Sequence, residues 1–307
     1  MLGRFGKDAG SLLGLEIAPD SIRMLQLQRV RGRQRVVGWA RHMLPVPLQG
    51  DWLEQPGPVL AALREAHARC GSRQQRVAIA LPGTQVICKR HTLPFGLCEF
   101  EQEAYLLAEA QGLFPFPLDD LALDFQVLGP AHNAPDRLEV LVAACRHSSL
   151  EPLLLRLEAA GLEVCAVEVD SIALARAAAL ASPGSQCRRL LLLEADGVVL
   201  HAWSDGLLPM RQARRWSVAQ DAAQRLDDIQ RLLAAGSTLS ADTALLVGGG
   251  AASRAQVEAM AEHLGVACEL LQPLGGLDLG VFESSGALRE ACASMTLACG
   301  LALGGVR

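Results

Sequence analysis

Hydrophobic and polar side chains alternate along the opening part of the chain in the way that is typical of β-strands. Residues 12–17 form an apolar run, and Pro19-Asp20 follows as a turn. Residues 22–27 alternate apolar with polar positions, and residues 33–40 do so again after a second turn. Because period-two alternation indicates strands, this pattern predicts a three-stranded meander.

A helix and two buried strands are predicted to complete this first unit. Residues 59–70 carry apolar side chains at helical spacing, and the helix is expected to end at Gly71. Residues 77–81 and 164–169 are short apolar runs, and the first of them stops at Pro82-Gly83. Such runs are typical of strands that are covered on both faces.

The stretch from about residue 88 to 162 has a different pattern of apolar and polar positions. It contains a helical segment at 99–111, with Phe100, Ala104 and Leu107 aligned, and two strand-like segments at 121–128 and 138–144. A second helix is expected to begin with Ser148 as its cap, because Glu151 stands at the capping-box position, and to end at Gly161. We interpret this stretch as a small sheet-and-helix unit inserted into the first lobe.

The strand–turn–strand pattern of the opening residues returns at residue 190. An apolar strand again ends in a glutamate, Glu194, and a tight turn and a second strand follow it. A third strand is expected after the turn Asp205-Gly206. Downstream come an amphipathic helix, a strand at 244–247, a glycine triplet and a helix capped by Ser253. Two segments that open alike predict a duplicated, two-lobed α/β architecture.

Composition excludes several classes of function. The net charge is −5, which argues against nucleic acid as the main ligand. Lys7 and Lys89 are the only lysines, and there is no GxxxxGK phosphate loop. The nine cysteines form no CxxC pair and the histidines form no HExxH motif, so no metal centre is predicted. No signal peptide or membrane span is recognised, which predicts a soluble cytoplasmic protein.

Four segments of the chain carry a recognisable set of motifs. They are an opening hairpin at 13–27, an inserted subdomain with its Pro-Phe-Pro-Leu connector at 93–125, a strand followed by a helix at 167–174, and a glycine loop at 246–250. Together they resemble the PilM family, the actin-like proteins of type IV pilus assembly, in which the opening hairpin corresponds to the first phosphate hairpin. The resemblance covers most of residues 10 to 303.

The resemblance implies an actin-like (ribonuclease H-like) fold of two lobes. The first lobe would span 10–187, with the insertion at about 88–162, and the second 188–307, with its upper helical subdomain largely missing. It also implies a cytoplasmic scaffold at the inner face of the inner membrane, touching the membrane only peripherally. The scaffold would bind the N-terminal tail of PilN, and family members also bind ATP between the lobes.

The sequence departs from the family where nucleotide binding is expected. Glu16 stands in place of an aspartate, and Glu194-Ala195-Asp196 replaces Asp-Ile-Gly in the second phosphate hairpin. Arg214-Arg215-Trp216 replaces a downstream glycine pair, and the stretch from there to Gly248 is short. An aspartate near a phosphate adds repulsion where a glycine would allow close approach. We therefore expect ATP–Mg binding to be weak or lost, with no required cofactor.

The residues left for a degenerate nucleotide site are Glu16 and the triplet Gly248, Gly249 and Gly250. The backbone amides of the triplet could meet a phosphate or a ribose, and Glu16 could hold magnesium through a water. The alternatives are structural. The triplet could be a tight strand-to-helix turn, and Glu16 could be a strand-end carboxylate that faces the cleft or bonds the hairpin turn.

A candidate site for the PilN tail comprises Leu93, Pro94, Phe114 and Phe116. Aromatic rings and prolines can line a rigid groove for an extended peptide. The alternative is that the phenylalanines close the core of the insertion itself. Both remain open from the sequence.

The sequence also allows other interpretations of the function. An actin-fold ATPase or phosphotransferase would need a catalytic base in the cleft, for which Glu16 is the candidate. The cytoplasmic part of a type II secretion system is a second scaffold interpretation. The alternating residues Arg29, Arg31, Arg33 and Arg35 could contact anionic lipid or form a solvated hairpin rim.

Overall fold

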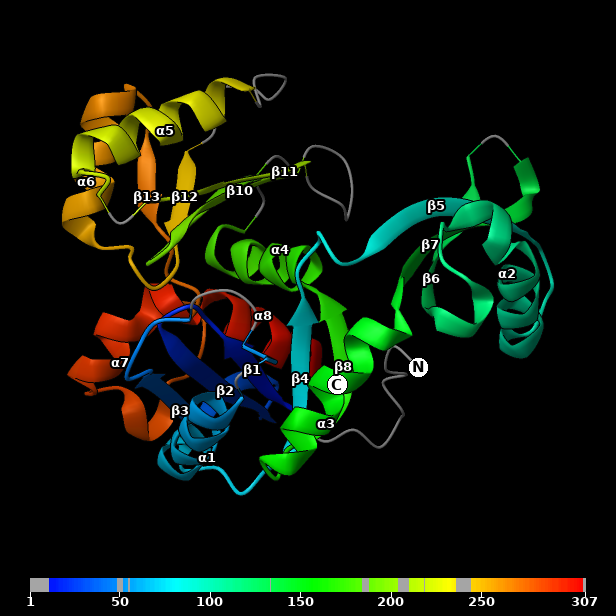
Figure 1. The fold of residues 1–307 in the computed structure, drawn as a ribbon, viewed down its shortest axis with the longest axis horizontal. Helices are drawn as coiled ribbons and strands as arrows, with labels where there is room; N and C mark the ends of the chain where they lie inside the picture. The colour runs from blue at the N-terminus through cyan, green and yellow to red at the C-terminus, as the bar shows by residue number, and fades with distance from the viewer. Residues whose placement is uncertain are drawn as a thin grey trace.

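A computed structural model describes residues 11–48, 52–54, 56–132, 134–183, 188–203, 210–217, 219–235 and 244–305. The predicted turn at Asp205-Gly206 lies outside these residues. The described chain forms two five-stranded sheets and one three-stranded sheet (Figure 1). Each of the two larger sheets has helices on both faces, which is the layered arrangement that a mixed α/β sequence predicts.

The first sheet has the strand order β3-β2-β1-β4-β8. The predicted meander forms its antiparallel half, and the buried apolar runs form its parallel half. The strands are β1 (Leu13–Ile17), β2 (Ser21–Val30), β3 (Arg33–Met43), β4 (Arg76–Leu81) and β8 (Glu163–Val169). One face packs against α1 (Gly57–Cys70) and α3 (His147–Ala159). Helix α1 ends at Gly71 in the left-handed conformation, as the sequence predicts.

The second sheet repeats this plan with the order β11-β10-β9-β12-β13. It contains β9 (Arg188–Glu194), β10 (Gly197–Trp203), β11 (Met210–Arg215), β12 (Leu245–Gly248) and β13 (Cys268–Leu270). Its outer face packs against α5 (Ala222–Ala235) and α6 (Arg254–Leu264). The side chain of Ser253 accepts a hydrogen bond from the amide of Gln256, which confirms the predicted cap of α6.

The third sheet, β5-β7-β6, belongs to the insertion and lies to one side of the two larger sheets (Figure 1). Its strands are β5 (Ile87–Pro94), β6 (Leu121–Ala131) and β7 (Ala134–Arg146), and α2 (Glu99–Leu113) and the single turn η1 (Leu118–Asp120) complete the unit. Helix α3 begins at His147 and not after Ser148, and the predicted Ser148 cap does not form because the Ser148 hydroxyl, like its amide, donates to the Asp120 carboxylate.

Two helices cross the middle of the molecule. Helix α4 (Asp170–Ala181) packs on the inner face of the second sheet, and α8 (Thr296–Gly305) packs on the first sheet and on α4 (Figure 1). A Cβ at Gly14 would collide with the carbonyl of Ala298, so this glycine is what lets α8 lie directly on β1.

The C-terminal segment differs from the expected division at residue 188. The turns η2 (Gly280–Phe282) and η3 (Cys292–Met295) and the short helix α7 (Gly286–Ala291) lie with α8 beside the first sheet. Apolar side chains from this segment fill the face of β2 and β3 that α1 does not cover. Residues 286–305 therefore pack with the first sheet, although the predicted second lobe included them.

Candidate functional site

The carboxyl ends of strands from both large sheets meet at one junction, which we call the cleft. The β1–β2 hairpin of the first sheet and the β9–β10 hairpin of the second approach each other there, and the loop after β12 lies beside them. Glu16 and Glu194 occupy matching positions near the ends of β1 and β9. The repeat that the sequence predicted therefore brings two glutamates face to face.

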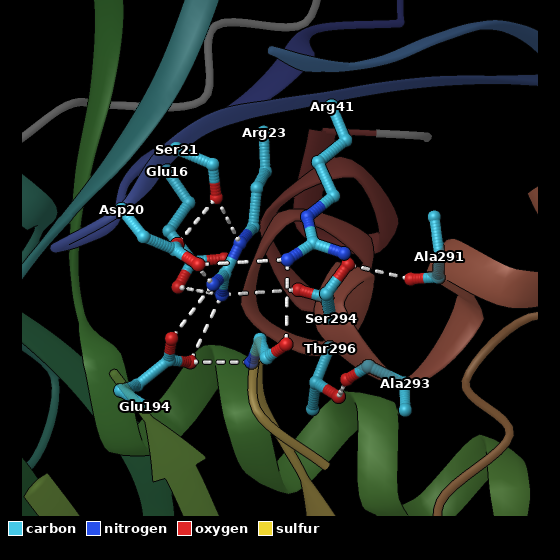
Figure 2. Close-up of polar contacts among 11 residues, drawn as sticks. Glu16, Asp20, Ser21, Arg23, Arg41, Glu194, Ala291, Ala293, Ser294 and Thr296 are labelled. Carbon is cyan, nitrogen blue, oxygen red and sulfur yellow. Dashed lines mark hydrogen bonds and ion pairs between the residues drawn. The ribbon is translucent and has the colours of Figure 1, made fainter. Parts of the chain in front are cut away.

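The guanidinium of Arg23 lies between these two glutamates (Figure 2). Its Nη1 donates to Glu16 Oε1 at 3.1 Å and to Glu194 Oε1 at 2.9 Å. Its Nη2 donates to Glu194 Oε2 at 2.7 Å and to Asp20 Oδ1 at 3.2 Å. Its Nε donates to Ser21 Oγ, and Nη1 also reaches the backbone carbonyl of Ser294 at 3.3 Å. Every nitrogen of the guanidinium is thus hydrogen-bonded.

We call this group the Arg23 clamp, comprising Arg23, Glu16, Asp20, Glu194 and the Ser294 carbonyl. Arg23 is 1% exposed. The pair formed by Arg23 and Glu194 is bidentate, the strongest geometry for an arginine–carboxylate contact. Because Arg23 lies on β2 and Glu194 on β9, this contact joins the two large sheets.

A second arginine supports the same junction. Arg41 Nη2 reaches the Gly250 carbonyl at 3.3 Å and the Asp20 carboxylate at 3.5 Å (Figure 2). Arg41 lies on β3 and Gly250 follows β12, so this contact also crosses between the sheets. The cleft therefore holds three carboxylates and two guanidinium groups, all supplied by the chain itself.

The charges in the cleft respond to burial and to one another. Burial raises the pKa of Glu16 to about 7, the Arg23 guanidinium opposes this rise, and the Glu194 carboxylate adds to it. The Oε2 atom of Glu16 is buried and has no hydrogen-bond donor among the described residues. Burial alone would lower the pKa of Arg23, but the surrounding carboxylates raise it overall, so the guanidinium stays charged. The clamp is an ion network in which Glu16 is the group that can gain a proton near neutral pH.

The glycine triplet lies directly beside this ion network. The Gly250 amide donates to Glu194 Oε1 at 3.1 Å, and the Gly249 amide donates to the Ala293 carbonyl at 2.9 Å. Gly249 has a φ of 100°, and a Cβ there would collide with the Leu193 carbonyl. A Cβ at Gly248 would lie 2.9 Å from Thr296 Oγ1. The triplet is therefore a tight turn whose neighbours are parts of this chain, as the structural alternative proposed.

Substituting alanine for Gly250 is expected to destabilise the protein. Its φ is not in the left-handed region, so the cost is steric: the new methyl group would collide with Arg23 Nη2 and lie 2.9 Å from Glu194 Oε2. We expect urea unfolding to show a loss of about 1–3 kcal/mol, the usual range for overpacking. Gly112→Ala is the control, because nothing lies within 4 Å of a Cβ at that helical position. A Gly250→Ala protein as stable as the wild type would contradict the predicted collision.

The cleft does not fit the nucleotide that the fold implies. In the arrangement seen here the Arg23 side chain fills the space above the glycine triplet, as the predicted collision at Gly250 shows. The amides of Gly249 and Gly250 are already bonded within the chain. The phosphates of a nucleotide would face Glu16, Asp20 and Glu194, and like charges in one site disfavour binding. Glu16 accepts a hydrogen bond from Arg23, a residue of the same hairpin.

Arg23 is the residue of this site that sequence reasoning missed. Arg23 occupies a polar position in an alternating strand, yet β2 is buried on both faces around it. A signal was present in the sequence, because Glu16, Asp20 and Glu194 are three carboxylates at the ends of predicted strands and require a cation.

A further contact between the lobes was also missed. Asp170, at the start of α4, accepts a hydrogen bond from the Gly83 amide, and Arg211 of β11 opposes the rise in the pKa of Asp170 that burial causes.

The candidate residues for peptide binding fall into two groups. Leu93 and Phe114 are 0% and 4% exposed in the core of the insertion, so neither offers a surface to a peptide. Pro94 and Phe116 are half-buried. Arg146 lies over the Phe116 ring at 5.4 Å. Leu93 and Phe114 therefore lie in the core of the insertion, Phe116 packs against the same core, and contact with a partner stays a prediction for Pro94 and Phe116.

The described part of the chain contains no group of three or more His, Cys, Asp or Glu side chains placed to hold a metal ion. Within the same residues no helix is both long and apolar enough to cross a membrane.

Comparison with known proteins places this architecture in a family. The sequence model of the family described as type IV pilus assembly protein PilM matches residues 14–186, more than half of the chain. The chain belongs to the PilM family. The match includes the first sheet and the whole insertion, which carry three of the four predicted PilM motifs, and the glycine loop at 246–250 lies outside it.

Solved structures extend the likeness to the whole chain. A chain of the PilM–PilN type IV pilus biogenesis complex superposes with a TM-score of 0.73 at 21% identity, covering 97% of this chain and 99% of that chain. The cytoplasmic domain of EpsL, an inner-membrane component of the type II secretion system of Vibrio cholerae, gives a TM-score of 0.43 at 15% identity, with 77% and 80% covered. A Bacteroides thetaiotaomicron protein with an actin-like ATPase fold gives 0.44 at 10% identity, with 86% and 92% covered. The fold is the actin-like α/β fold that the sequence predicts.

Proposed function

We propose that this PilM-family protein is a cytoplasmic scaffold of type IV pilus assembly that binds the N-terminal tail of a PilN-like membrane protein. The observation that carries this proposal is the membership of the PilM family together with the intact insertion, to which the first lobe is joined through a shared apolar core. Binding such a tail would hold the protein at the inner face of the inner membrane.

The connector between α2 and β6 is the part of the insertion best placed for this contact. Its end is anchored to α3, which packs against the first sheet, because Asp120 accepts hydrogen bonds from the amide and the hydroxyl of Ser148 at the start of that helix. Leu118 is 47% exposed beside this anchor, and the prolines of the connector are also exposed. Proline lacks an N–H donor and fixes φ, so the connector offers a rigid apolar rim at the junction of insertion and lobe.

Peptide binding tests this proposal directly. A labelled peptide with the N-terminal cytoplasmic sequence of the PilN-like protein from the same organism is expected to bind with micromolar or tighter affinity in a fluorescence anisotropy titration. Phe116→Ser and Leu118→Ser are expected to weaken binding about tenfold each, the usual effect of truncating an apolar contact at an interface. Both side chains lie on or beside the connector.

Val281→Ser is the matched control. Val281 is an apolar side chain that is 88% exposed, but it lies on η2 beside the first sheet and not on the connector. Its substitution is expected to leave the peptide affinity unchanged. Absence of binding well above micromolar concentration would contradict the proposed function, and equal losses in all three variants would contradict the proposed location.

A further inference from the structure

We propose that Arg23 has replaced a bound nucleotide as the element that joins the two lobes, so that the cleft of this protein is closed by its own side chain. Actin-like folds enclose their ligand between two hairpins and a glycine loop. Here the same three segments meet at a guanidinium. The consequence is a scaffold that is held in one closed arrangement and does not respond to ATP.

The hydrogen bonds of the clamp support this proposal because they leave no donor for a ligand. Nε, Nη1 and Nη2 of Arg23 are each bonded to an oxygen of this chain between 2.7 and 3.3 Å away. A phosphate would have to displace a carboxylate from a bidentate pair that is already formed and buried. Arginine binds phosphates and carboxylates through the same planar fork, so the carboxylate of Glu194 takes the position on Arg23 that a phosphate would need.

Contacts across the cleft show that the clamp holds the lobes and does not merely fill a space. Arg23 on β2 is bonded to Glu194 on β9, and Arg41 on β3 is bonded to the carbonyl of Gly250 after β12. Glu194 in turn accepts a hydrogen bond from the Gly250 amide. The first hairpin, the second hairpin and the glycine loop are therefore linked in one network. In a protein that opened to admit ATP, all of these bonds would have to break together.

Ligand-induced stabilisation tests the inference on the wild-type protein. Any ligand that binds the folded state raises Tm, and millimolar concentrations of a ligand with a micromolar Kd raise it by several degrees. We expect millimolar Mg-ATP or Mg-ADP to leave Tm unchanged and to give no binding heat in calorimetry. A Tm rise of several degrees, or a micromolar Kd, would overturn the inference.

The same inference predicts that removal of Arg23 opens the molecule. In Arg23→Ala we expect small-angle scattering to show a larger radius of gyration than in the wild type, and trypsin to cut the folded protein faster. The matched control is Arg35→Ala, because Nε and Nη2 of Arg35 also contact a carboxylate, both at Asp278 Oδ2, but at the surface, where the Arg35 side chain is 42% exposed. A radius of gyration unchanged in Arg23→Ala would overturn the role of Arg23 as the link between the lobes.

Arg23→Lys and chemical rescue keep the test decisive if Arg23→Ala does not fold. Lysine retains the charge but cannot form the planar fork, so Arg23→Lys is expected to have a radius of gyration between those of the wild type and an open form. Methylguanidinium at millimolar concentration is expected to raise the Tm of Arg23→Lys or Arg23→Ala and not that of the wild type, and methylammonium is expected to have no such effect. Equal responses of variant and wild type to methylguanidinium would contradict the proposal.

One consequence concerns the partner and rests on the proposed function. The affinity for the PilN-like tail is expected to be the same with and without Mg-ATP. Failure of the tail to bind at all would contradict the proposed function alone, because the measurements of Tm, heat and scattering use the protein by itself. Tail affinity that changes with Mg-ATP would contradict the inference alone.

Discussion

Arg23→Met is expected to lower the free energy of unfolding by about 3–5 kcal/mol, which is the typical cost of removing one partner from a buried ion pair. Methionine fills much of the same volume, so the loss comes from the charges and not from a cavity. The carboxylates of Glu16, Asp20 and Glu194 would remain in the cleft without their cation. Urea unfolding of the two proteins at pH 7 measures the difference.

Two comparisons separate this effect from ordinary surface changes. Arg35→Met removes a pair whose arginine is 42% exposed, so we expect a loss below about 1 kcal/mol. The double variant Arg23→Met/Glu194→Gln is expected to be more stable than the sum of the single losses predicts, because its remaining cleft has one negative charge fewer. Additive losses would show that Arg23 and Glu194 do not interact across the lobes.

The sequence predicts the strands, turns and glycine loop around this site well, because each of these depends on a local pattern. The period-two alternation, the paired turns and the glycine loop are each encoded within a few residues, and they give the hairpins of both sheets. The likeness of the two strand ends, each with its glutamate, is also visible in the sequence. What these two glutamates do depends on residues far apart in the chain, since 171 positions separate Arg23 from Glu194.

The insertion illustrates the same limit from the apolar side. Phe100, Ala104 and Leu107 form a stripe at helical spacing, yet Phe100 is 76% exposed and α2 buries Leu106 and Ala110 instead. Periodicity identifies a helix but cannot choose between two apolar faces when both are present. The choice follows from the sheet, because Leu93 on β5 and Val140 and Val142 on β7 form the core that Leu106 joins.

Glu16→Gln is expected to stabilise the protein above neutral pH, although Glu16 is a partner of Arg23. The pKa of Glu16 is about 7 in the folded protein, against 4.5 for an ordinary glutamate. Between these two values the unfolded chain has lost the proton that the folded protein still holds. The stability that Glu16 contributes is therefore complete below about pH 4.5, falls as the pH rises to about 7, and stays low above it. Glutamine does not ionise, so the stability of the variant does not decrease in this way as the pH rises.

The difference in unfolding free energy between Glu16→Gln and the wild type isolates this group, because the other titrating residues contribute alike to both. A shift of this size corresponds to about 3 kcal/mol between the low-pH and high-pH limits, and we expect about 2–3 kcal/mol because the side chain is 13% exposed. Urea unfolding at several pH values from 5 to 8.5 measures it. A variant that is less stable than the wild type at pH 8, by an amount that does not shrink with rising pH, would mean that the ionised Glu16 is a net stabilising partner of Arg23. The negative charge of Glu16 would then be offset by the guanidinium groups of the clamp. The contribution of Glu16 to the free energy of unfolding would not depend on pH near neutrality.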